Sequence, residues 1–315
     1  MPWSGFEGFH DFLSSWRGRI SEKTQSNASF AWFWRADPQI ELTYNDAGWP
    51  FRTYEKQIEQ SAKHGDAFGL HTHPWRWDSA VNRWIADFGN PQWVETCVRS
   101  SFDIFERYFG AQCRLFRFGD GWLDNSTFEL IEKLGAQIDL TLEPGSEAKL
   151  FLVKEELTTG LIPDRRKIPN YPYHPARTDF RRVDSSGRST LWIVPVSTAR
   201  KPISRLRDFQ SFLPDLLRPY RRTLQLNLGF EPSLFEHLFE QSLFAMRQPY
   251  VAICARTDVG ANNSPRGFAD RNLGYILGHK LADQFVFTLP VPAIGYLNGH
   301  RGDPDGATHG VSTSG

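Results

Sequence analysis

The spacing of apolar residues along the chain changes repeatedly between short strand-like runs and longer segments with helical periodicity. The segments with helical spacing cover residues 51–64, 91–109, 125–134, 204–218, 231–247 and 266–282. The strand-like runs cover residues 28–35, 67–73, 113–118, 137–142, 191–196, 223–228, 250–255 and 284–289. Such alternation is typical of βαβ units around a mostly parallel sheet. The pattern therefore predicts an α/β fold, and a closed or nearly closed barrel is its simplest form.

Local signals mark where several of these helices begin and end. Asn90 followed by Pro91 is typical of an N-cap with proline at the first helical position. Gly110, Gly65 and Gly135 each follow a helical segment. Glycine adopts the left-handed conformation that commonly ends a helix, so these positions predict three helix ends.

The chain shows no internal repeat and no sharp shift in composition, so we expect a single domain over residues 1–298. Residues 144–190 interrupt the alternation with a stretch rich in Pro, Tyr and Arg. This excursion is too long for an ordinary connection and is expected to be a lid or substrate loop. The tail at residues 299–315 has almost no apolar side chains and is expected to be disordered.

Composition narrows the class of protein. The 315 residues are 40% hydrophobic, enough for a sizeable core, and the 36 Lys and Arg balance the 36 Asp and Glu. The overall charge therefore predicts no nucleic-acid partner, although it leaves room for a local basic patch. Cys97, Cys113 and Cys254 have no metal-binding or disulfide spacing, which favours a reducing compartment. With no leader pattern and no long apolar run, we expect a cytoplasmic protein without an integral membrane segment.

The most informative chemistry lies at the ends of two predicted strands. His71 and His73 alternate at the end of the strand 67–73, so both imidazoles point to one face and can reach one metal ion. Asp37 follows the strand 28–35. Two imidazoles and one carboxylate make a metal-ligand set that leaves positions for water and substrate. The plainer alternatives are two histidines at the rim and an aspartate that caps the turn before Pro38.

A third group follows the strand 113–118. Arg117 and Asp120 stand in the sequence FRFGDGW, where they can hold each other or a substrate. A glycine-rich turn with a structural Arg–Asp pair is the alternative. Asp258 lies just past another predicted strand end, and barrel enzymes build their active sites on the face where their strands end.

Three further side chains are expected to bind substrate. Trp75 and Trp122 stand beside these motifs and suit stacking against sugar rings, with core packing as the alternative. Arg256 follows the strand 250–255 and offers a guanidinium to the same edge.

The order of these motifs resembles the polysaccharide deacetylase superfamily, metal-dependent hydrolases on a distorted (β/α) barrel. The resemblance rests on a strand ending in Asp, then HTHPW, FRFGDGW, a helix ending in LG, and LWIVPVS. It covers most of residues 28–290, motif by motif. It implies a barrel of seven or eight βα units that binds zinc or a similar divalent ion. Asp37 and His71 match two of the family's metal ligands, and Arg117 matches the arginine that braces the catalytic carboxylate.

The chain departs from the family pattern at three places. Ala36 stands where the family has an aspartate that acts as the base. The family spaces its histidines by four, but Trp75 occupies that position here and His73 is offered instead, as in divergent members with HxHPW. The family's late histidine is also missing. We therefore expect Asp120 or Asp258 to be the general base, Asp120 first, although Arg117 nearby could lower the pKa of Asp120 and make it a poor base.

These observations favour a metal-dependent hydrolase that removes an N-acyl group, most simply acetyl, from a sugar in a glycan or glycan precursor. The metal would polarise the amide carbonyl and lower the pKa of its bound water. Ala36 favours an alternative, a carbohydrate-binding or scaffold protein that has lost turnover. A hydrolase of another non-peptide C–N bond is the third hypothesis, since fold and metal do not fix the substrate.

Overall fold

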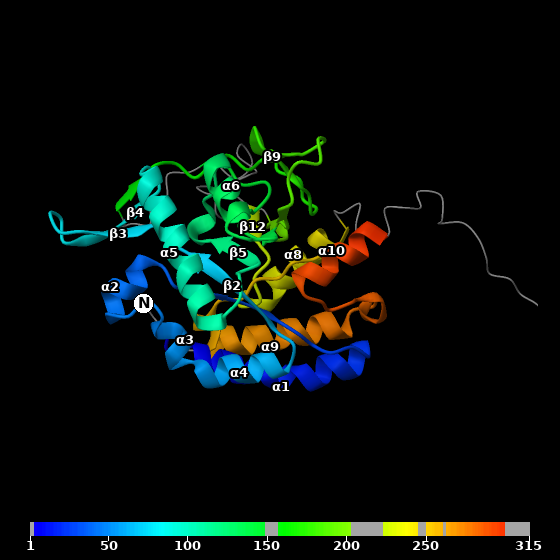
Figure 1. The fold of residues 1–315 in the computed structure, drawn as a ribbon. Helices are drawn as coiled ribbons and strands as arrows, with labels where there is room; N and C mark the ends of the chain where they lie inside the picture. Colours follow the sequence, from blue (N-terminus) through cyan, green and yellow to red (C-terminus); the bar gives the residue numbers. More distant parts are fainter. Residues whose placement is uncertain (1–2, 149–156, 203–222, 245–249, 261–262, 300–315) are drawn as a thin grey trace, which may run out of the picture.

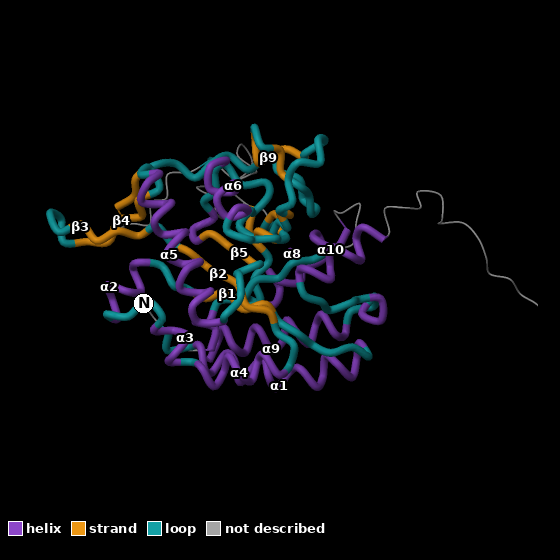
Figure 2. The backbone as a smooth tube through the Cα atoms, in the orientation of Figure 1, coloured by secondary structure: helices purple, strands orange, loops and turns teal. Residues whose placement is uncertain are grey.

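The computed structural model describes residues 3–148, 157–202, 223–244, 250–260 and 263–299. Its centre is a five-stranded parallel sheet in the order β1-β2-β5-β6-β10. Figures 1 and 2 show helices below this sheet and the long excursion above it. The strands are β1 (Ala31–Trp34), β2 (Ala67–Thr72), β5 (Leu115–Phe118), β6 (Ile138–Asp139) and β10 (Trp192–Ile193).

Helices cover the sheet and connect its strands. α1, α4 and α9 run side by side along one side of the molecule, while α5 packs on β2 and α6 (Figure 1). The α-helices described are α1 (Phe6–Thr24), α2 (Pro38–Tyr44), α3 (Trp49–Thr53), α4 (Glu55–Lys63), α5 (Pro91–Phe109), α6 (Asn125–Lys133), α8 (Pro232–Phe244), α9 (Asn263–Gly278) and α10 (Pro290–Gly299).

Short strands and single helical turns lie outside the central sheet. β3 and β4 form a hairpin that β7 extends, β8 pairs with β9, and β11 pairs with β12. These strands are β3 (Trp75–Asp78), β4 (Arg83–Asp87), β7 (Leu157–Thr159), β8 (Pro175–Ala176), β9 (Asp179–Val183), β11 (Thr198–Arg200) and β12 (Thr223–Gln225). The 3₁₀ turns are η1 (Gly119–Gly121), η3 (Thr257–Gly260) and η4 (Ala282–Gln284).

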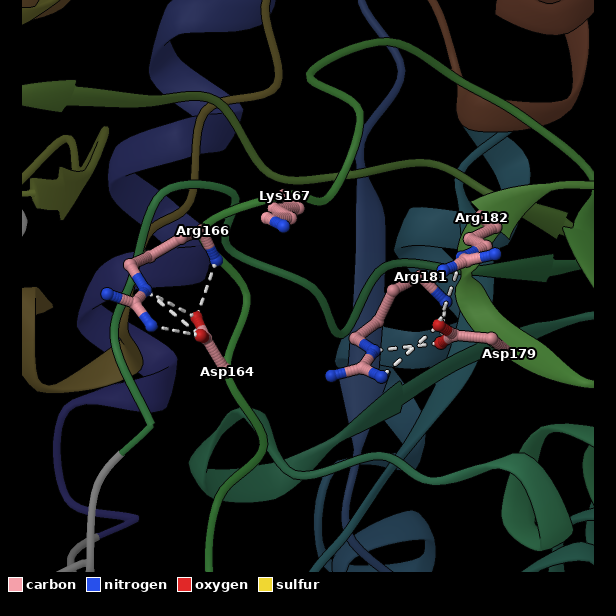
Figure 3. A pocket seen from close by; sticks show the side chains of 6 residues that line it. All are labelled: Asp164, Arg166, Lys167, Asp179, Arg181 and Arg182. Carbon is pink, nitrogen blue, oxygen red and sulfur yellow. Dashed lines mark hydrogen bonds and ion pairs between the residues drawn. The ribbon is translucent and has the colours of Figure 1, made fainter.

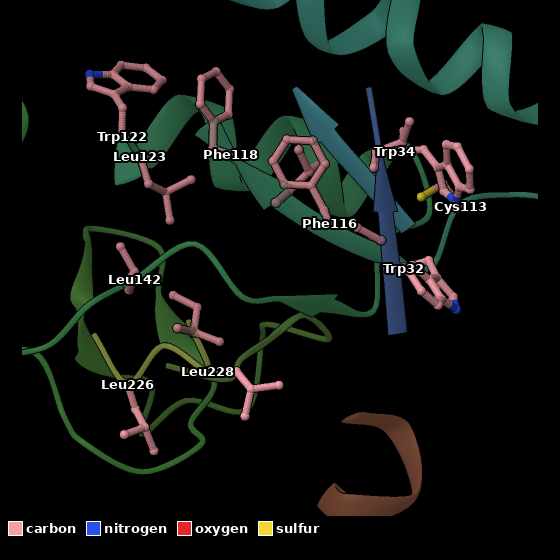
Figure 4. Packing of buried hydrophobic residues seen from close by; sticks show 14 of the residues in the cluster. Trp32, Trp34, Cys113, Phe116, Phe118, Trp122, Leu123, Leu142, Leu226 and Leu228 are labelled. Carbon is pink, nitrogen blue, oxygen red and sulfur yellow. The ribbon is translucent and has the colours of Figure 1, made fainter. Parts of the chain in front are cut away.

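The two faces of the central sheet carry different side chains, because successive residues of a strand point to opposite faces. Trp34, Leu70 and Phe116 are register partners on one face and lie in the main core. Figure 4 labels Trp34 and Phe116 in this core. On the other face, Leu115 and Ile138 form a smaller apolar cluster with Ile294 of α10, and Ala67 packs against it. The second face is therefore apolar where β2 and β5 begin and polar where they end.

Several predicted helix ends are confirmed. α5 has the predicted bounds, and the Asn90 side chain accepts a hydrogen bond from the backbone N–H of Trp93 at 3.1 Å. Gly65, Gly110 and Gly135 all have positive φ, at 76°, 65° and 100°. These glycines supply the left-handed conformation that ends each helix.

Other predicted elements differ from the structure. The segment 51–64 forms two helices, α3 and α4, that meet at Tyr54. The predicted strand 284–289 is wrong, because it has no neighbouring strand and leads directly into α10. Phe285 stacks on His279 instead, with ring centroids 5.6 Å apart, so side-chain packing accounts for its apolar pattern. The predicted strand 250–255 forms one bridge, between Asn227 and Cys254. The predicted helix 204–218 lies outside the described residues.

The mixed α/β architecture with a parallel central sheet is confirmed, and the closed barrel is not. Beyond β10 the backbone continues in sheet-like contact, with Val196 N–H bonding Leu142 C=O at 2.9 Å and Cys254 N–H bonding Leu226 C=O at 3.0 Å. In the described part of the chain, no backbone hydrogen bond joins residues 250–255 to β1. The backbone pairing therefore continues beyond β10, and the described residues contain no pair that closes the sheet onto β1.

The structure describes most of the predicted excursion but only the first residue of the predicted tail. Residues 157–190 contain β7, β8 and β9, and Asn125 ties the β8–β9 hairpin to the start of α6. Of the predicted tail, Gly299 is the last residue of α10, and residues 300–315 lie outside the described residues. Among the described helices, none combines the length and apolar character needed to cross a bilayer.

Gly69 in β2 gives a test of this packing. A Cβ at this position would lie 2.6 Å from the Leu115 carbonyl oxygen and 2.7 Å from Leu115 Cβ. We expect Gly69→Ala to lower the free energy of unfolding by about 1–3 kcal/mol, because two strands must move apart. Gly18→Ala in α1 is the control, since nothing lies within 4 Å of its Cβ. It should raise stability by about 0.5–1 kcal/mol. Urea unfolding checks both, and an equal effect of the two substitutions would contradict the packing described.

Candidate active site

The candidate site lies where β2 and β5 end on the polar face of the sheet. The parallel register places His71 directly beside Arg117. His73 follows β2 by one residue, and Asp120 lies in the turn η1 that follows β5. Two adjacent strands therefore bring together residues that lie almost fifty positions apart.

The two imidazoles face each other. The Nε2 atoms of His71 and His73 are 2.9 Å apart, and their rings are inclined at 76°. Two nitrogen lone pairs at this distance repel, so the pair shares either a proton or a bound cation. Burial holds the pKa of His71 well below its usual range, and the positive charges of His73 and Arg117 lower this pKa further. His71 is therefore a neutral imidazole at neutral pH.

Asp120 orients the second imidazole. Its Oδ2 lies 3.0 Å from His73 Nδ1 and accepts a hydrogen bond from the indole N–H of Trp75 at 3.1 Å. Burial alone would raise the pKa of Asp120, but the hydrogen bond and charge of His73 lower it overall. The carboxylate is thus ionised and accepts a proton-bearing Nδ1, which leaves His73 Nε2 directed at His71.

The backbone conformation around Asp120 allows its close contact with His73. Asp120 has φ 57° and ψ 10°, a left-handed conformation that is uncommon for residues other than glycine. A Cβ on Gly119 would lie 2.5 Å from His73 Cγ and Nδ1. The strained residue and the glycine before it together let the turn approach the His73 ring.

Asp37 lies at the same edge but faces a different partner. Its side chain is completely buried, and the Arg35 guanidinium donates to both carboxylate oxygens, at 2.8 and 2.9 Å. Asp37 Oδ2 also accepts the backbone N–H of His73 at 3.1 Å. Asp37 therefore holds the His73 backbone in place while Arg35 takes up its charge.

This arrangement bears on the expected metal ion. The histidine pair fits two of the three expected ligands, since both Nε2 atoms converge on one point. Asp37 does not fit as the third, because both of its oxygens are bound by Arg35. In the part of the chain that the structure describes, no group of three His, Cys, Asp or Glu side chains lies where it could hold a metal.

Arg117 reaches across the polar face rather than to Asp120. It donates to Cys254 Sγ at 2.8 Å and to Gln225 Oε1 at 3.1 Å. Glu143 lies 3.9 Å from Arg117 and 3.7 Å from Arg165, between the two guanidiniums. Arg117 thus connects β5 to the segments that follow β10.

The other predicted site residues are placed as follows. Asp258 pairs with Arg256 at 3.3 Å; the side chain of Arg256 is largely exposed and that of Asp258 is partly exposed. Among the described contacts neither touches the histidine pair, although the charge of Arg256 is near enough to lower the pKa of His71. Trp122 is 6% exposed and stacks on Phe88 in the main core, so packing accounts for its side chain. Trp75 contacts both Asp120 and His73.

Three residues that the structure places beside the histidines were not predicted from the sequence. Arg35 stands two positions before Asp37. An Arg-x-Asp at a strand end is a sequence signal for the ion pair that the two residues form. Glu143 follows β6 by four residues and carries the same strand-end signal as Asp120. Gln225 has no signal in the sequence, because its contact with Arg117 depends on how the later strands fold back.

Asp139 gives a pH-dependent prediction. Burial raises its pKa to about 7, although hydrogen bonds from Thr141 and the charge of Arg117 act in the opposite direction. An aspartate in the unfolded chain has a pKa of about 3.9, so between these values the folded state holds a proton that the unfolded state releases. The free energy of unfolding should therefore fall as pH rises from about 4 to about 7.

Asp139→Asn should flatten this dependence. Urea unfolding at about pH 5 and about pH 8 measures it, and the slope attributable to Asp139 is at most about 1.4 kcal/mol per pH unit. Asp103→Asn, on the exposed side of α5, is the matched control and should keep the slope. An unchanged slope in Asp139→Asn would contradict the assignment.

Gly119→Ala tests how closely the turn approaches His73. The added methyl group should push the His73 ring away from Asp120, because no space exists for it. We expect the NMR signal of the hydrogen-bonded His73 Nδ1–H to be lost or shifted while the overall fold is kept. Gly18→Ala in α1 is the comparison: Gly18, like Gly119, has no positive φ, but nothing lies within 4 Å of a Cβ at Gly18. The same spectral change in both variants would count against the proposed contact.

Comparisons with known proteins come from structure alone. Neither a protein-family model nor a curated protein sequence matches the chain. The structure is similar to a crystal structure described as a "putative polysaccharide deacetylase" from Mycobacterium smegmatis, with a TM-score of 0.50 and 14% identity over 98% of this chain and 82% of the other. A second similarity, to Puue allantoinase, has a TM-score of 0.42 and 14% identity over 79% of this chain and 64% of the other. The first similarity shows that the fold is of the type found in that deacetylase-like structure.

Proposed function

We propose that this protein is a hydrolase that removes an acyl group from the nitrogen of an acylated sugar. The observation that carries the proposal is the chain of contacts from Asp120 through His73 to His71, at the edge where two parallel strands end. In sheets of this type, ligands bind at the carboxyl ends of the strands. The similarity to a deacetylase-like fold supports the choice of reaction class.

Each residue has a role in this proposal. Asp120 accepts the Nδ1 proton of His73 and so keeps Nε2 directed toward His71. The neutral His71 completes a pair of ring nitrogens that would share a proton or a bound cation at the reaction centre. Asp37 fixes the backbone of His73, and Arg35 balances its buried charge. In this arrangement Asp120 is a positioning residue, where the sequence alone favoured it as the general base.

A divalent metal, zinc first, belongs to the proposal because the resemblance implies it. The support on the side of the protein is the convergence of two imidazole nitrogens, one of them oriented by a carboxylate as metal-binding histidines commonly are. Such an ion would act as a Lewis acid at the carbonyl of the substrate. The position of Asp37 against Arg35 leaves the remaining ligand unassigned.

A carbohydrate-binding protein without turnover is the second candidate. One observation favours it: Ala36 stands where the family has its base, and both oxygens of the neighbouring Asp37 already accept hydrogen bonds from Arg35. The two candidates differ in whether acetate is released.

The test measures acetate release from N-acetylglucosamine oligosaccharides, alongside elemental analysis. We expect activity in the unmodified protein and a loss of about 10²–10⁴-fold in kcat for Asp120→Asn, since an amide orients the imidazole wrongly. His71→Ala and His73→Ala should abolish activity and bound metal together. Asp103→Asn on α5 is the matched control and should keep both.

The outcomes separate the candidates. Asp258→Asn should change kcat much less than Asp120→Asn, and the reverse would move the reaction centre to η3. Oligosaccharide binding without acetate release would favour the carbohydrate-binding candidate. Stoichiometric metal in His71→Ala would show that the histidine pair is not the metal site.

A further inference from the structure

The excursion over residues 157–190 differs in charge from the rest of the chain. It contains seven basic and three acidic residues, whereas the whole protein has equal numbers of each. The proposed reaction centre uses none of these side chains. The charge of this segment therefore calls for a separate explanation.

Part of this charge lines a pocket of about 320 Å³, which Figure 3 shows. Two stretches of backbone form it, one before β8 and the other in β9. All six lining side chains are charged, four positive and two negative: Asp164, Arg166, Lys167, Asp179, Arg181 and Arg182. A pocket lined only by charged groups does not suit an apolar ligand.

The two carboxylates are already bound by neighbouring guanidiniums. Arg166 Nε donates to both oxygens of Asp164, at 3.0 and 2.9 Å. Arg181 Nε donates to Asp179 at 2.8 Å, and Arg182 Nε lies 3.5 Å from the same carboxylate. Within the pocket no dashed line joins Lys167 to any other lining residue (Figure 3). An excess of two positive charges therefore faces the pocket.

The walls of the pocket are held firmly. Asn125 at the start of α6 donates to the Thr178 carbonyl at 2.8 Å and accepts the Phe180 N–H at 2.9 Å, which fixes the β8–β9 hairpin. On the other wall, the carboxylate of Asp164 is close enough to raise the pKa of Arg181 together with Asp179. The backbone of the hairpin is thus fixed, and the basic side chains of the pocket extend from it and from the facing segment into solvent.

The pocket is also connected to the proposed reaction centre. Arg165 stands between Asp164 and Arg166 in the sequence, but its side chain is 1% exposed and points inward. It donates to the carbonyl of Gly121 at 3.3 Å, next to Asp120, and pairs with Glu143 at 3.7 Å. One short stretch therefore contributes both to the pocket and to the support of the turn that holds Asp120.

We propose that this pocket binds an oxyanion on the substrate, a phosphate or a carboxylate attached to the sugar. Guanidinium groups present planar pairs of N–H donors that match the oxygens of both anions, and Lys167 adds a point charge. Binding of an oxyanion in this pocket does not depend on the proposed function. Only the statement that the oxyanion belongs to the substrate rests on it. Two sources share this chemistry: the diphosphate of a nucleotide- or lipid-linked sugar, and the carboxylate of a uronic acid.

Isothermal titration calorimetry tests the pocket without any turnover. The probes are inorganic pyrophosphate and a glucuronate oligosaccharide, each titrated into the unmodified protein. We expect the double variant Lys167→Gln, Arg181→Gln to bind about tenfold more weakly, roughly threefold for each exposed charge removed. Raising the salt from about 0.05 M to about 0.5 M should weaken binding as well, because exposed charges are screened.

The control double variant is Arg99→Gln, Arg107→Gln, which removes the same charge from the exposed side of α5. It should bind like the unmodified protein. An equal loss in both double variants would show attraction by overall charge and overturn the pocket, as would the absence of binding by both probes. Tighter binding of pyrophosphate assigns the pocket to a diphosphate, and tighter binding of the oligosaccharide assigns it to a uronic acid.

These results are distinguishable from a failure of the proposed function. Oxyanion binding without acetate release from any sugar leaves the pocket standing and overturns the hydrolase. Acetate release from neutral oligosaccharides, with no oxyanion binding, keeps the hydrolase and overturns the pocket.

Discussion

The pairing of β2 with β5 is the constraint on which the candidate site depends. Because the strands are parallel and in register from Leu70 to Thr72, His71 must stand beside Arg117 and both strands must end at the same edge. His73 and Asp120 then meet because each follows its strand by one or two residues. A shift of one residue in this register would turn His71 to the opposite face, where Leu70 now packs. The packing of Trp34, Leu70 and Phe116 in the main core prevents such a shift.

Buried charge is balanced close to where it arises. Arg17 binds Asp66, whose carboxylate also accepts hydrogen bonds from the Phe30 N–H and the Trp32 indole. Arg35 and Asp37 form a second such pair beside the histidines. Isolated buried charges are costly, so these pairs keep the interior of the sheet stable while they fix the ends of β1 and β2. Among the described contacts, Asp139 has no comparable bidentate arginine partner, and burial raises its pKa instead.

The sequence predicted local features well and long-range contacts poorly. The bounds of α5 follow from Asn90 and Gly110, which act through their immediate neighbours. α1 was not among the predicted elements, although its buried residues recur at helical spacing, because Gly8 and Gly18 lower helix propensity. Gly8 is required there by a distant contact, since a Cβ on it would lie 3.0 Å from the Gly260 carbonyl oxygen. Such a requirement is invisible in the local pattern.

The same distinction holds for the site. The convergence of His71 and His73 follows from strand alternation and could be predicted. The partners of the charged residues could not, since Arg117 turned to Cys254 and Gln225 rather than to Asp120. Which carboxylate a guanidinium binds depends on how strands far apart in the sequence curl toward each other. Spacing alone therefore predicted that the two imidazoles converge, but not which ion pairs surround them.

The spacing of the two histidines by two residues has a consequence for how such a site can change over evolution. Both imidazoles are carried by one extended segment, and His73 is additionally tied through its backbone to Asp37. Insertion of a single residue between them would rotate one ring to the far side of the strand, where Leu70 and Phe116 pack. Substitution alone can move a histidine along such a segment only in steps of two residues if both rings are to stay on one face. The spacing of the pair is therefore tied to the extended conformation that carries it.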